Sequence, residues 1–430
     1  MTTTNIQYTV KNNLCTGCGV CEDICPTHSI SMHLINNEWK PKIKKETCIN
    51  EKGCKKCFDV CSGHGINLLA FTKRTFEHAQ KEDKYVGRYL STYTGYSCDK
   101  DIRYHSSSGG LVTQFLIFLL EKKVIDGAVV TGYGKDHITP YSYIARNKEE
   151  ILSAKGSKYC PVTLNKIGNE ICKNEGKYII VGLPCHIQGF RKREEIDSNF
   201  RKNVYGYFAL YCSSNRNYSA TEYLFQKYKV KKSKIGYFSF RDEGCLGSLI
   251  IKPRVGEYLQ LSEKNNEDMQ NLKVPYLHYY GRLRSFFIPH RCLSCIDHYG
   301  MLADISFGDI HIPPYSEDKV GVNSIIVRNS FYDNLLIQAK VEGFIVLNEL
   351  DVHILNESQK TMLYPKKRKA KALMNLDKLV GNKIVHYDIE ITEKPLLKDY
   401  ISVYVKFIQR YIGDRSWLWW LIDLSNINKK

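Results

Sequence analysis

Three features are missing from this 430-residue sequence, and each absence narrows what the chain can be. No apolar run reaches the ~18 residues that a membrane-spanning helix needs, and the nearest candidate, LVTQFLIFLL at 111–120, fits a buried helix better. The polar start MTTTNIQYTV lacks the apolar core of a secretory signal. No G-x-G-x-x-G occurs, so the usual dinucleotide fingerprint is absent. We expect a soluble, cytoplasmic protein with no transmembrane segment.

The chain has fewer acidic than basic residues, 45 Asp and Glu against 62 Lys and Arg, which gives a formal net charge of +17. The basic residues concentrate in Lys40–Lys45, in KYKVKKSK (227–234) and in PKKRKAK (365–371). The favoured interpretation is a solvated, lysine-rich surface. The functional alternative is attraction to an acidic partner: a small redox protein, a phosphorylated cofactor or a membrane surface. No aromatic–basic interleaving accompanies the charge, so we do not expect nucleic-acid binding.

Cysteine is abundant at the start of the chain, where two runs of four appear within 61 residues. Cys15, Cys18, Cys21 and Cys25, followed by Pro26, read C-x2-C-x2-C-x3-C-P, the bacterial-ferredoxin run for 4Fe-4S clusters. Cys48, Cys54, Cys57 and Cys61 read C-x5-C-x2-C-x3-C. In such modules the fourth cysteine of each run ligates the other cluster. The predicted pairings are therefore Cys15, Cys18 and Cys21 with Cys61, and Cys48, Cys54 and Cys57 with Cys25.

Two other uses of these cysteines remain open. Structural zinc prefers two separate C-x2-C pairs, which the first run fits poorly. Disulfides need an oxidising compartment, which the polar N-terminus does not indicate. The second run departs from the ferredoxin pattern twice, since its first gap is five residues and Ser62 replaces the expected proline.

The rest of the chain predicts a different architecture. Residues 1–72 are expected to form an α+β dicluster ferredoxin-like module, and residues 73–84 a charged linker. Residues 85–350 alternate predicted strands and helices, which indicates an α/β domain with a mixed, mainly parallel sheet. Within it, IGYFSFRD (235–242) and GSLIIKPRV (247–255) are predicted as a more exposed β pair. Residues 351–430 lose this rhythm and form a basic and amphipathic extension.

Four further cysteines suggest a third metal site. Cys185 and Cys212 each follow a predicted buried strand, and sites in open α/β sheets gather at the carboxyl ends of strands. Cys292 and Cys295 add a C-x2-C pair, so the four thiols suit a third cubane or a zinc ion. The alternative is that Cys185 and Cys212 are ordinary buried cysteines. Cys98, Cys160, Cys172 and Cys245 have no partner spacing and are predicted to be structural.

Two turns suit a phosphate group. Ser106–Gly110 (SSSGG) lie directly before a predicted helix, whose N-terminal amides favour anions. Lys155–Tyr159 (KGSKY) add two lysines and a hydroxyl next to another predicted helix start. In a chain with electron-carrying clusters, a flavin nucleotide is a reasonable occupant, because flavins join two-electron to one-electron chemistry.

Taken in order, SSSGG, KGSKY, VGLPC, LYC, FRD (240–242), C-x2-C and ADISFGD (303–309) resemble the coenzyme F-420 hydrogenase/dehydrogenase beta-subunit family, over residues 5–350. The resemblance implies FAD and a cluster on Cys185, Cys212, Cys292 and Cys295. FAD would lie near Ser107, Ser108, Gly109, Gly110, Lys155, Ser157, Lys158 and Tyr159, with Arg241 and Asp309 as weaker candidates. His186 departs from the family, where glutamine is expected.

The resulting hypothesis is an iron–sulfur flavoenzyme that passes electrons between 4Fe-4S clusters, FAD and a deazaflavin coenzyme or another organic substrate. The alternatives are a non-catalytic electron-transfer subunit and a zinc-rich interaction protein. Tyr159, His186 and Lys158 are candidates for proton transfer by proximity only. Near the C-terminus, Trp417, Trp419 and Trp420 favour packing on the body or on a partner over contact with a membrane surface.

Overall fold

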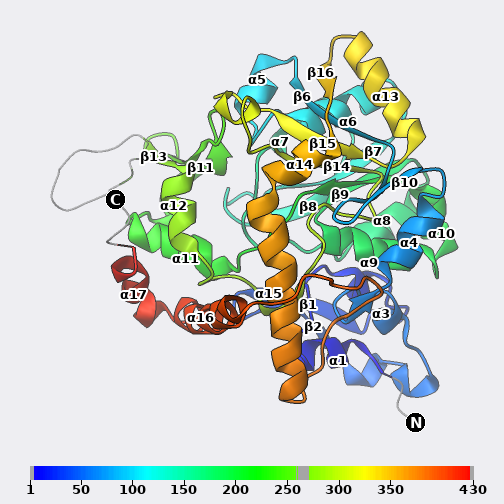
Figure 1. Ribbon diagram of the computed structural model, residues 1–430, viewed down its shortest axis with the longest axis vertical. Coiled ribbons are helices and arrows are strands. Elements are labelled where there is room, and N and C mark those ends of the chain that lie inside the picture. The colour runs from blue at the N-terminus through cyan, green and yellow to red at the C-terminus, as the bar shows by residue number, and fades with distance from the viewer. Residues whose placement is uncertain (1–3, 258, 260–270, 427–430) are drawn as a thin grey trace.

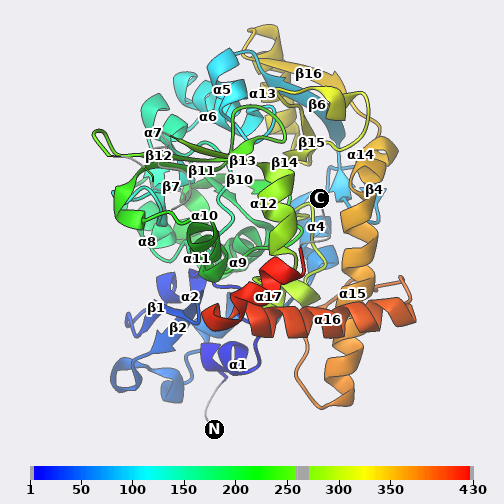
Figure 2. The same ribbon diagram turned by 90° about the vertical axis from the view of Figure 1, so that its left-hand side faces the viewer.

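The structure, a computed structural model, describes residues 4–257, 259 and 271–426 (Figures 1 and 2). Its N-terminal part is a small α+β module in which short helices flank an antiparallel hairpin. The hairpin turns at Asn36 and Asn37, whose φ values are 50° and 60°, as tight two-residue turns require. The module contains α1 (Ile6–Lys11), α2 (Val20–Asp23), β1 (Ile30–Ile35), β2 (Glu38–Ile43), α3 (Lys56–Asp59), β3 (Gly65–Ile66) and α4 (Leu68–Thr75).

The centre of the molecule is an eight-stranded mixed sheet in the order β16-β6-β15-β14-β10-β9-β7-β8. Parallel ladders join β14, β10, β9 and β7, whereas the strands toward both edges pair antiparallel. Five strands (β6, β7, β9, β10 and β14) therefore point one way and three the other, as predicted for a mixed, mainly parallel sheet. The strands are β6 (Ser91–Ser97), β7 (Gly127–Tyr133), β8 (Pro140–Ala145), β9 (Tyr178–Gly182), β10 (Val204–Leu210), β14 (Ile305–Asp309), β15 (Asn323–Val327) and β16 (Ile345–Glu349).

Helices cover both faces of this sheet (Figure 1). Side chains alternate along each strand, so Ile179 faces one core and Ile180 the other. One core lies under α5 (Lys100–Tyr104), α6 (Leu111–Glu121), α7 (Lys148–Ser153) and α13 (Ser330–Val341). The opposite core lies under α8 (Ile167–Lys173), α9 (Pro184–Glu194) and α10 (Ser198–Asn203), and side chains of the N-terminal module complete it.

A second, three-stranded antiparallel sheet stands beside the first and has a core of its own. It contains β11 (Ile235–Asp242), β12 (Ser248–Pro253) and β13 (Leu272–Pro275), with α11 (Tyr218–Lys227) and α12 (Tyr276–Leu283) packed nearby. The predicted pairing of 235–242 with 247–255 is correct, but the predicted exposure is wrong. Phe238, Phe240 and Leu249 are buried, because the two helices and the C-terminal Trp419 cover them.

The predicted linker and C-terminal extension both carry regular structure. Residues 73–84 hold the end of α4 and the strand β4 (Lys81–Asp83), which pairs with β5 (Gly87–Tyr89). The extension runs through α14 (Val352–Ser358), the long α15 (Lys360–Leu379), β17 (His386–Tyr387), α16 (Leu397–Gly413) and α17 (Trp419–Leu424). It returns to the N-terminal module, where β17 pairs with β3. Figure 2 shows α15 and α16 beside that module. Trp419 packs on Tyr223, whereas Trp417 and Trp420 are exposed.

The module is fastened to the large domain by a buried ion pair. Asp23, at the end of α2, lies 2.9 Å from the Arg193 guanidinium on α9, and both side chains are at most 2% exposed. The same carboxylate accepts hydrogen bonds from the backbone amides of Gly168 and Asn169, at the start of α8. Burial raises the pKa of Asp23 to about 6, although the Arg193 charge opposes that shift. Three partners therefore meet at one desolvated carboxylate.

We predict that Asp23→Ala lowers the free energy of unfolding by about 3 kcal/mol, because two buried amides lose their acceptor and the buried Arg193 guanidinium keeps only one of its two carboxylate partners, Asp197. Urea denaturation measures the loss. The matched control is Glu175→Ala at the exposed Lys202–Glu175 pair, which should cost less than about 1 kcal/mol. Equal losses in the two variants would show that the α2 contact does not fasten the module.

Candidate functional site

The structure brings the predicted cluster cysteines together in three groups of four thiols. The middle group is Cys15, Cys18, Cys21 and Cys61. Burial raises the pKa of Cys21 well above its usual value, and the neighbouring Cys18, Cys15 and Cys61 raise it further. Two backbone amides point at sulfur: Gly17 N–H lies 3.4 Å from Cys15 Sγ, and Gly63 N–H lies 3.3 Å from Cys61 Sγ. The thiol of Cys61, from the second run, thus lies beside three thiols of the first run, where the predicted exchange of fourth cysteines puts it.

The outer group is Cys25, Cys48, Cys54 and Cys57. Burial raises the pKa of Cys57 to about 11, and the thiols of Cys25, Cys54 and Cys48 add to that shift. The five-residue gap after Cys48 therefore does not keep its thiol away. Cys48, Cys54 and Cys57 are half-buried, whereas every member of the middle group is buried. Cys57 also neighbours Cys21, so the outer and middle groups adjoin.

The inner group is Cys185, Cys212, Cys292 and Cys295, gathered where the strands β9 and β10 end. Burial raises the pKa of Cys185 well above its usual value, as do the nearby Cys212, Cys18, Cys292 and Cys295. Cys18 belongs to the middle group, so the inner and middle groups are neighbours. The Ser62 hydroxyl also donates to the carbonyl of Cys185 at 3.1 Å, across the two domains.

One buried and two half-buried cations lie beside these thiols. On α15, Lys366 Nζ donates to the carbonyls of Cys212 and Asp297 at 2.6 and 2.8 Å. Arg291, beside Cys292, donates from Nε to the Gly63 carbonyl at 2.8 Å. On α9, Lys192 Nζ donates to the Cys61 carbonyl at 2.7 Å. Cations in these positions favour the anionic state of thiolates held in a desolvated place. The basic run 365–371 is thus not simply a solvated surface, because Lys367 is buried as well.

One cavity joins the middle and inner groups. Its lining includes Cys15 from the middle group and Cys185, Cys212, Cys292 and Cys295 from the inner group. Among the residues that the structure describes, no three or more His, Cys, Asp or Glu side chains form a group that could hold one metal ion, so the thiols of each group are neighbours without the spacing of ligands to a single ion.

The residues predicted to hold a flavin converge from several elements. The Ser157 amide donates to Ser107 Oγ at 2.8 Å, which joins the SSSGG and KGSKY turns. Arg241 Nη1 lies 2.7 Å from Asp309 Oδ2 and 3.5 Å from the Tyr159 hydroxyl. The Arg241 charge keeps the pKa of Asp309 below its usual value, although burial opposes this. We call Ser107, Ser108, Ser157, Tyr159, Arg241 and Asp309 the strand-end cluster.

One detail of the predicted phosphate site is wrong, and both of its turns also have structural roles. Gly109 is required by the fold, since a Cβ there would come within 2.8 Å of the Gly95 carbonyl and 2.9 Å of the Asn323 amide. The first amide of α6, Leu111 N–H, is already bonded to Asn323 Oδ1 at 3.2 Å. The KGSKY turn follows the end of α7 rather than preceding a helix. Lys155 pairs with Asp101 at 3.3 Å, and Lys158 Nζ donates to carbonyls at the end of α7.

His186 is held by the backbone. Its Nδ1 accepts from the Leu183 amide at 3.3 Å, and its Nε2 lies 3.2 Å from the Val162 carbonyl. Burial lowers the pKa of His186 to about 4, so the ring is neutral at physiological pH. The imidazole lines the cysteine cavity and fixes the turn that presents Cys185.

An aromatic group that the sequence interpretation missed lies between the strand-end cluster and the inner thiols. The rings of Tyr159 and Tyr280 are 4.7 Å apart, and those of Tyr276 and Tyr280 stack at 4.8 Å. The Arg216 guanidinium lies 4.8 Å from the Tyr280 ring, and its buried Nε has no hydrogen-bond partner among the described residues. Burial raises the pKa of Tyr280 to about 12, with Cys212 among its neighbours. The available signal was the pair Tyr276 and Tyr280, four residues apart on α12.

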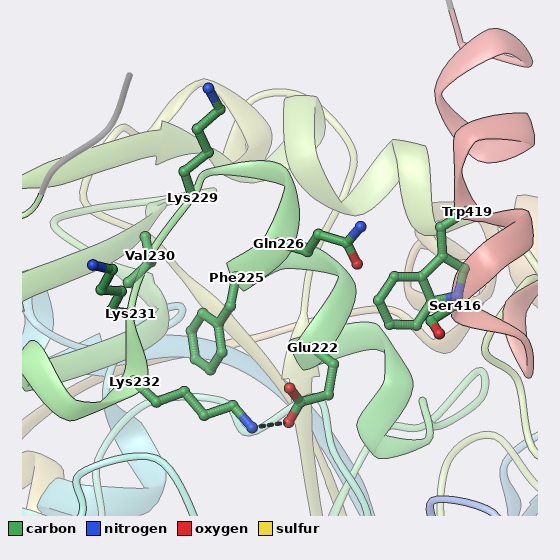
Figure 3. Close-up of a pocket in the computed structure, with 9 residues that line it drawn as sticks. All are labelled: Glu222, Phe225, Gln226, Lys229, Val230, Lys231, Lys232, Ser416 and Trp419. Carbon is green, nitrogen blue, oxygen red and sulfur yellow. Dashed lines mark hydrogen bonds and ion pairs between the residues drawn. The ribbon is translucent and has the colours of Figure 1, made fainter. Parts of the chain in front are cut away.

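The four remaining cysteines lie outside the three groups. Cys98 is exposed, Cys160 is buried, and Cys172 lies 3.8 Å from Arg193. Cys245 lies 4.0 Å from Arg241 Nη2, at the edge of the strand-end cluster. A separate hollow between α11 and α17 is rimmed by Lys229, Lys231 and Lys232 and shares no residue with the cysteine cavity (Figure 3).

Thiol groups in a ferredoxin-like module beside a mixed α/β sheet define an iron–sulfur, electron-transfer oxidoreductase. The chain belongs to the coenzyme F420 hydrogenase/dehydrogenase beta-subunit family. The family model for the N-terminal part of that subunit matches residues 92–167, and the model for its C terminus matches residues 175–353. A 4Fe-4S binding domain matches residues 8–31.

The chain is 26% identical to the coenzyme F420 hydrogenase subunit beta of Methanosarcina barkeri, over 65% of this chain and 94% of that one. It is 25% identical to the coenzyme F420-dependent sulfite reductase of Methanocaldococcus jannaschii, over 80% of this chain and 48% of that one. A chain of the F420-reducing [NiFe] hydrogenase complex from M. barkeri has the same fold, with a TM-score of 0.53 and 21% identity over 71% of this chain and 98% of that one.

We predict that Gly109→Val destabilises the protein by about 1–3 kcal/mol, because its side chain overlaps two backbone segments. Ser107→Ala, which removes the hydrogen bond between the two turns, should cost about 1 kcal/mol and leave the fold intact. Thermal and urea unfolding of both variants test this. A Gly109→Val protein as stable as the parent would mean that the β6 and β15 backbones move aside, and the glycine would lose its structural explanation.

Proposed function

We propose that this chain is an iron–sulfur flavoprotein oxidoreductase that passes electrons between three 4Fe-4S clusters, FAD and a diffusible organic substrate. One observation carries the proposal: the redox-competent groups form an unbroken series. The outer thiols adjoin the middle thiols at Cys57 and Cys21, and the middle thiols adjoin the inner ones at Cys18 and Cys185. Tyr280 and Tyr159 then connect Cys212 with Arg241.

The donor sets fit clusters. Each group offers four thiols from two or more elements, and backbone amides and half-buried cations stabilise the charge of thiolates there. Cubane clusters take four cysteine ligands and are tuned by such hydrogen bonds, net charge and burial. The middle group is the most strongly shielded from solvent, since its four thiols are buried, whereas three outer thiols and all four inner ones are half-buried.

The strand-end cluster and the aromatic group fit a flavin. Arg241 supplies a cation, Ser107 and Ser157 supply short polar side chains, and Tyr276 and Tyr280 supply flat surfaces for a planar ring. Asp309 is the last residue of β14, and the carboxyl ends of strands are the usual place for ligands of open α/β sheets. A bound flavin would exchange hydride with an organic substrate and single electrons with the clusters.

The names of the relatives favour a deazaflavin substrate, since they include a coenzyme F420 hydrogenase subunit and an F420-dependent sulfite reductase. Another organic substrate is compatible with the same site. A second candidate is a non-catalytic electron-transfer subunit, favoured by the subunit status of the hydrogenase relative. Turnover of reduced coenzyme F420 with a viologen acceptor by the isolated chain supports the enzyme, and its failure with a range of hydride donors supports the subunit.

We predict about twelve iron atoms per chain in anaerobically purified protein, four for each cubane. Changing Cys292→Ser and Cys295→Ser together should remove about four of them and leave the N-terminal clusters reducible by dithionite. Iron and acid-labile sulfide assays measure the loss, and Cys98→Ser serves as the control that removes none. An unchanged iron content in the double variant would contradict a cluster on the inner group.

Flavin content provides an independent prediction. The double change Arg241→Met and Asp309→Asn removes a cation from the proposed flavin site without leaving its partner charged, so the protein should keep its iron but lose most of its FAD. FAD released by acid is measured by fluorescence. The matched control exchanges Arg368→Met and Asp399→Asn, an ion pair of 3.0 Å in the extension, and should retain FAD. An unchanged FAD content in the Arg241→Met, Asp309→Asn protein would show that the flavin binds elsewhere.

A further inference from the structure

The second cysteine run contains a feature that the thiol chemistry does not use. The run lies in a lysine-rich segment: residues 42–56 hold Lys42, Lys44, Lys45, Lys52, Lys55 and Lys56 against two glutamates, Glu46 and Glu51. All six lysines are exposed. Among the described residues only Lys55 of the six has an ion-pair partner, Asp59, at 3.9 Å. We call these six lysines the lysine collar.

The collar surrounds the outer thiol group, which lies near solvent. Cys48, Cys54 and Cys57 lie within or beside the same segment and are half-buried, whereas all four middle thiols are buried. The inner thiols are half-buried too, but they line the cavity between the module, the large domain and α15. The collar is held against the outer group by the fold, since the Lys44 amide donates to the Ser29 carbonyl at 2.8 Å and the Ser29 amide points at Cys25 Sγ at 3.3 Å. Electrons that arrive from another protein must tunnel over a short distance, so a redox centre near solvent and bordered by exposed lysines is a place for such a protein to dock.

From this geometry we propose that the lysine collar is the docking surface for an acidic, single-electron carrier protein, which exchanges electrons with the outer thiol group. The proposal rests on the proposed function, because it needs a cluster on the outer group. It gives the series of groups a direction in space: carrier, outer, middle, inner and then the strand-end cluster. The step is a one-electron transfer, in which the reduced carrier is oxidised and the outer cluster is reduced, with no bond made or broken.

Surface charge of this kind changes the rate at which two proteins associate. Unpaired surface lysines around a redox centre attract an acidic partner and orient it, which raises the association rate at low ionic strength by roughly 10-fold or more. Salt screens the effect, because the Debye length falls from about 10 Å at 0.1 M to about 3 Å at 1 M. If the collar works in this way, the association rate of the carrier should fall when the lysines are removed, and that fall should be smaller at high salt.

The chain provides a matched control. Lys229 and Lys231 are also exposed lysines, and they rim the hollow of Figure 3, which shares no residue with the module that holds the collar. Exchanging two lysines for glutamate changes the net charge by the same amount at either place. A general charge effect would slow the two double variants equally, whereas a docking surface slows only one.

The test uses full-length protein with its clusters and reduced flavodoxin, an acidic carrier whose own absorbance reports its oxidation. Stopped-flow mixing measures the second-order rate. Lys52→Glu with Lys56→Glu should lower this rate about tenfold at low salt, and Lys229→Glu with Lys231→Glu less than about twofold. The difference should shrink at high salt. Reduced methyl viologen, a small cation that does not need the collar to dock, should reduce both variants at least as fast as the parent.

Lys52 and Lys56 lie close to cluster cysteines, so Lys44→Glu with Lys45→Glu provides a second variant outside the Cys48–Cys57 loop. This variant should lower the rate of flavodoxin oxidation in the same salt-dependent way, and its iron and sulfide content should be unchanged. Equal slowing by the 229/231 pair, or slowing that persists at high salt, overturns the docking surface. If the collar variants keep their full iron content and oxidise flavodoxin at the parent's rate, the docking surface is overturned and the proposed function stands. If the parent protein holds no clusters, the proposed function and the docking surface are overturned together.

Discussion

The arrangement of the redox groups depends on one contact, the seating of α2 against α8 and α9. Asp23 meets Arg193 and two helix-start amides in a place almost without solvent, and the adjacent Gly19 has no room for a side chain because Thr163 and Asn165 lie against it. This contact brings Cys18 next to Cys185. Together with the Ser62–Cys185 and Lys192–Cys61 hydrogen bonds, it fixes the position of the module's thiols relative to the large domain.

The C-terminal extension reinforces the same seating from the other side. β17 pairs with β3, and the Asp388 carboxylate accepts from the amides of Leu69 and Ala70 at the start of α4. α15 carries Lys366 to the inner thiols and Lys367 to the backbone of Lys84. The extension thus links module and domain and supplies a cation to a place where thiolates would otherwise be expensive to bury.

Strand-end positions were predictable, because a strand, its direction and the turn after it are local properties. Cys185 and Cys212 illustrate this, and so does Asp309 at the end of β14. The exposure of β11 and β12 was not predictable, since α11, α12 and Trp419 cover them from distant parts of the chain. Gly109 shows a related limit of prediction from sequence. A glycine at this position is typical of a phosphate-binding turn, but the backbone atoms that leave no room for a side chain belong to the distant Gly95 and Asn323.

The sequence by itself determined the two four-cysteine runs and the mixed sheet, and it predicted that the runs exchange their fourth cysteines. Those features follow from spacing and periodicity, which act over a few residues, whereas the family was indicated by the resemblance of an ordered set of motifs. Only the tertiary structure decided that the three thiol groups adjoin in the order outer, middle and inner, that Tyr280 and Arg216 lie between Cys212 and Arg241, and that Lys366 is a partner of the inner group rather than part of a solvated run. These relations join residues up to hundreds of positions apart, and burial and charge pairing in the packed chain select them.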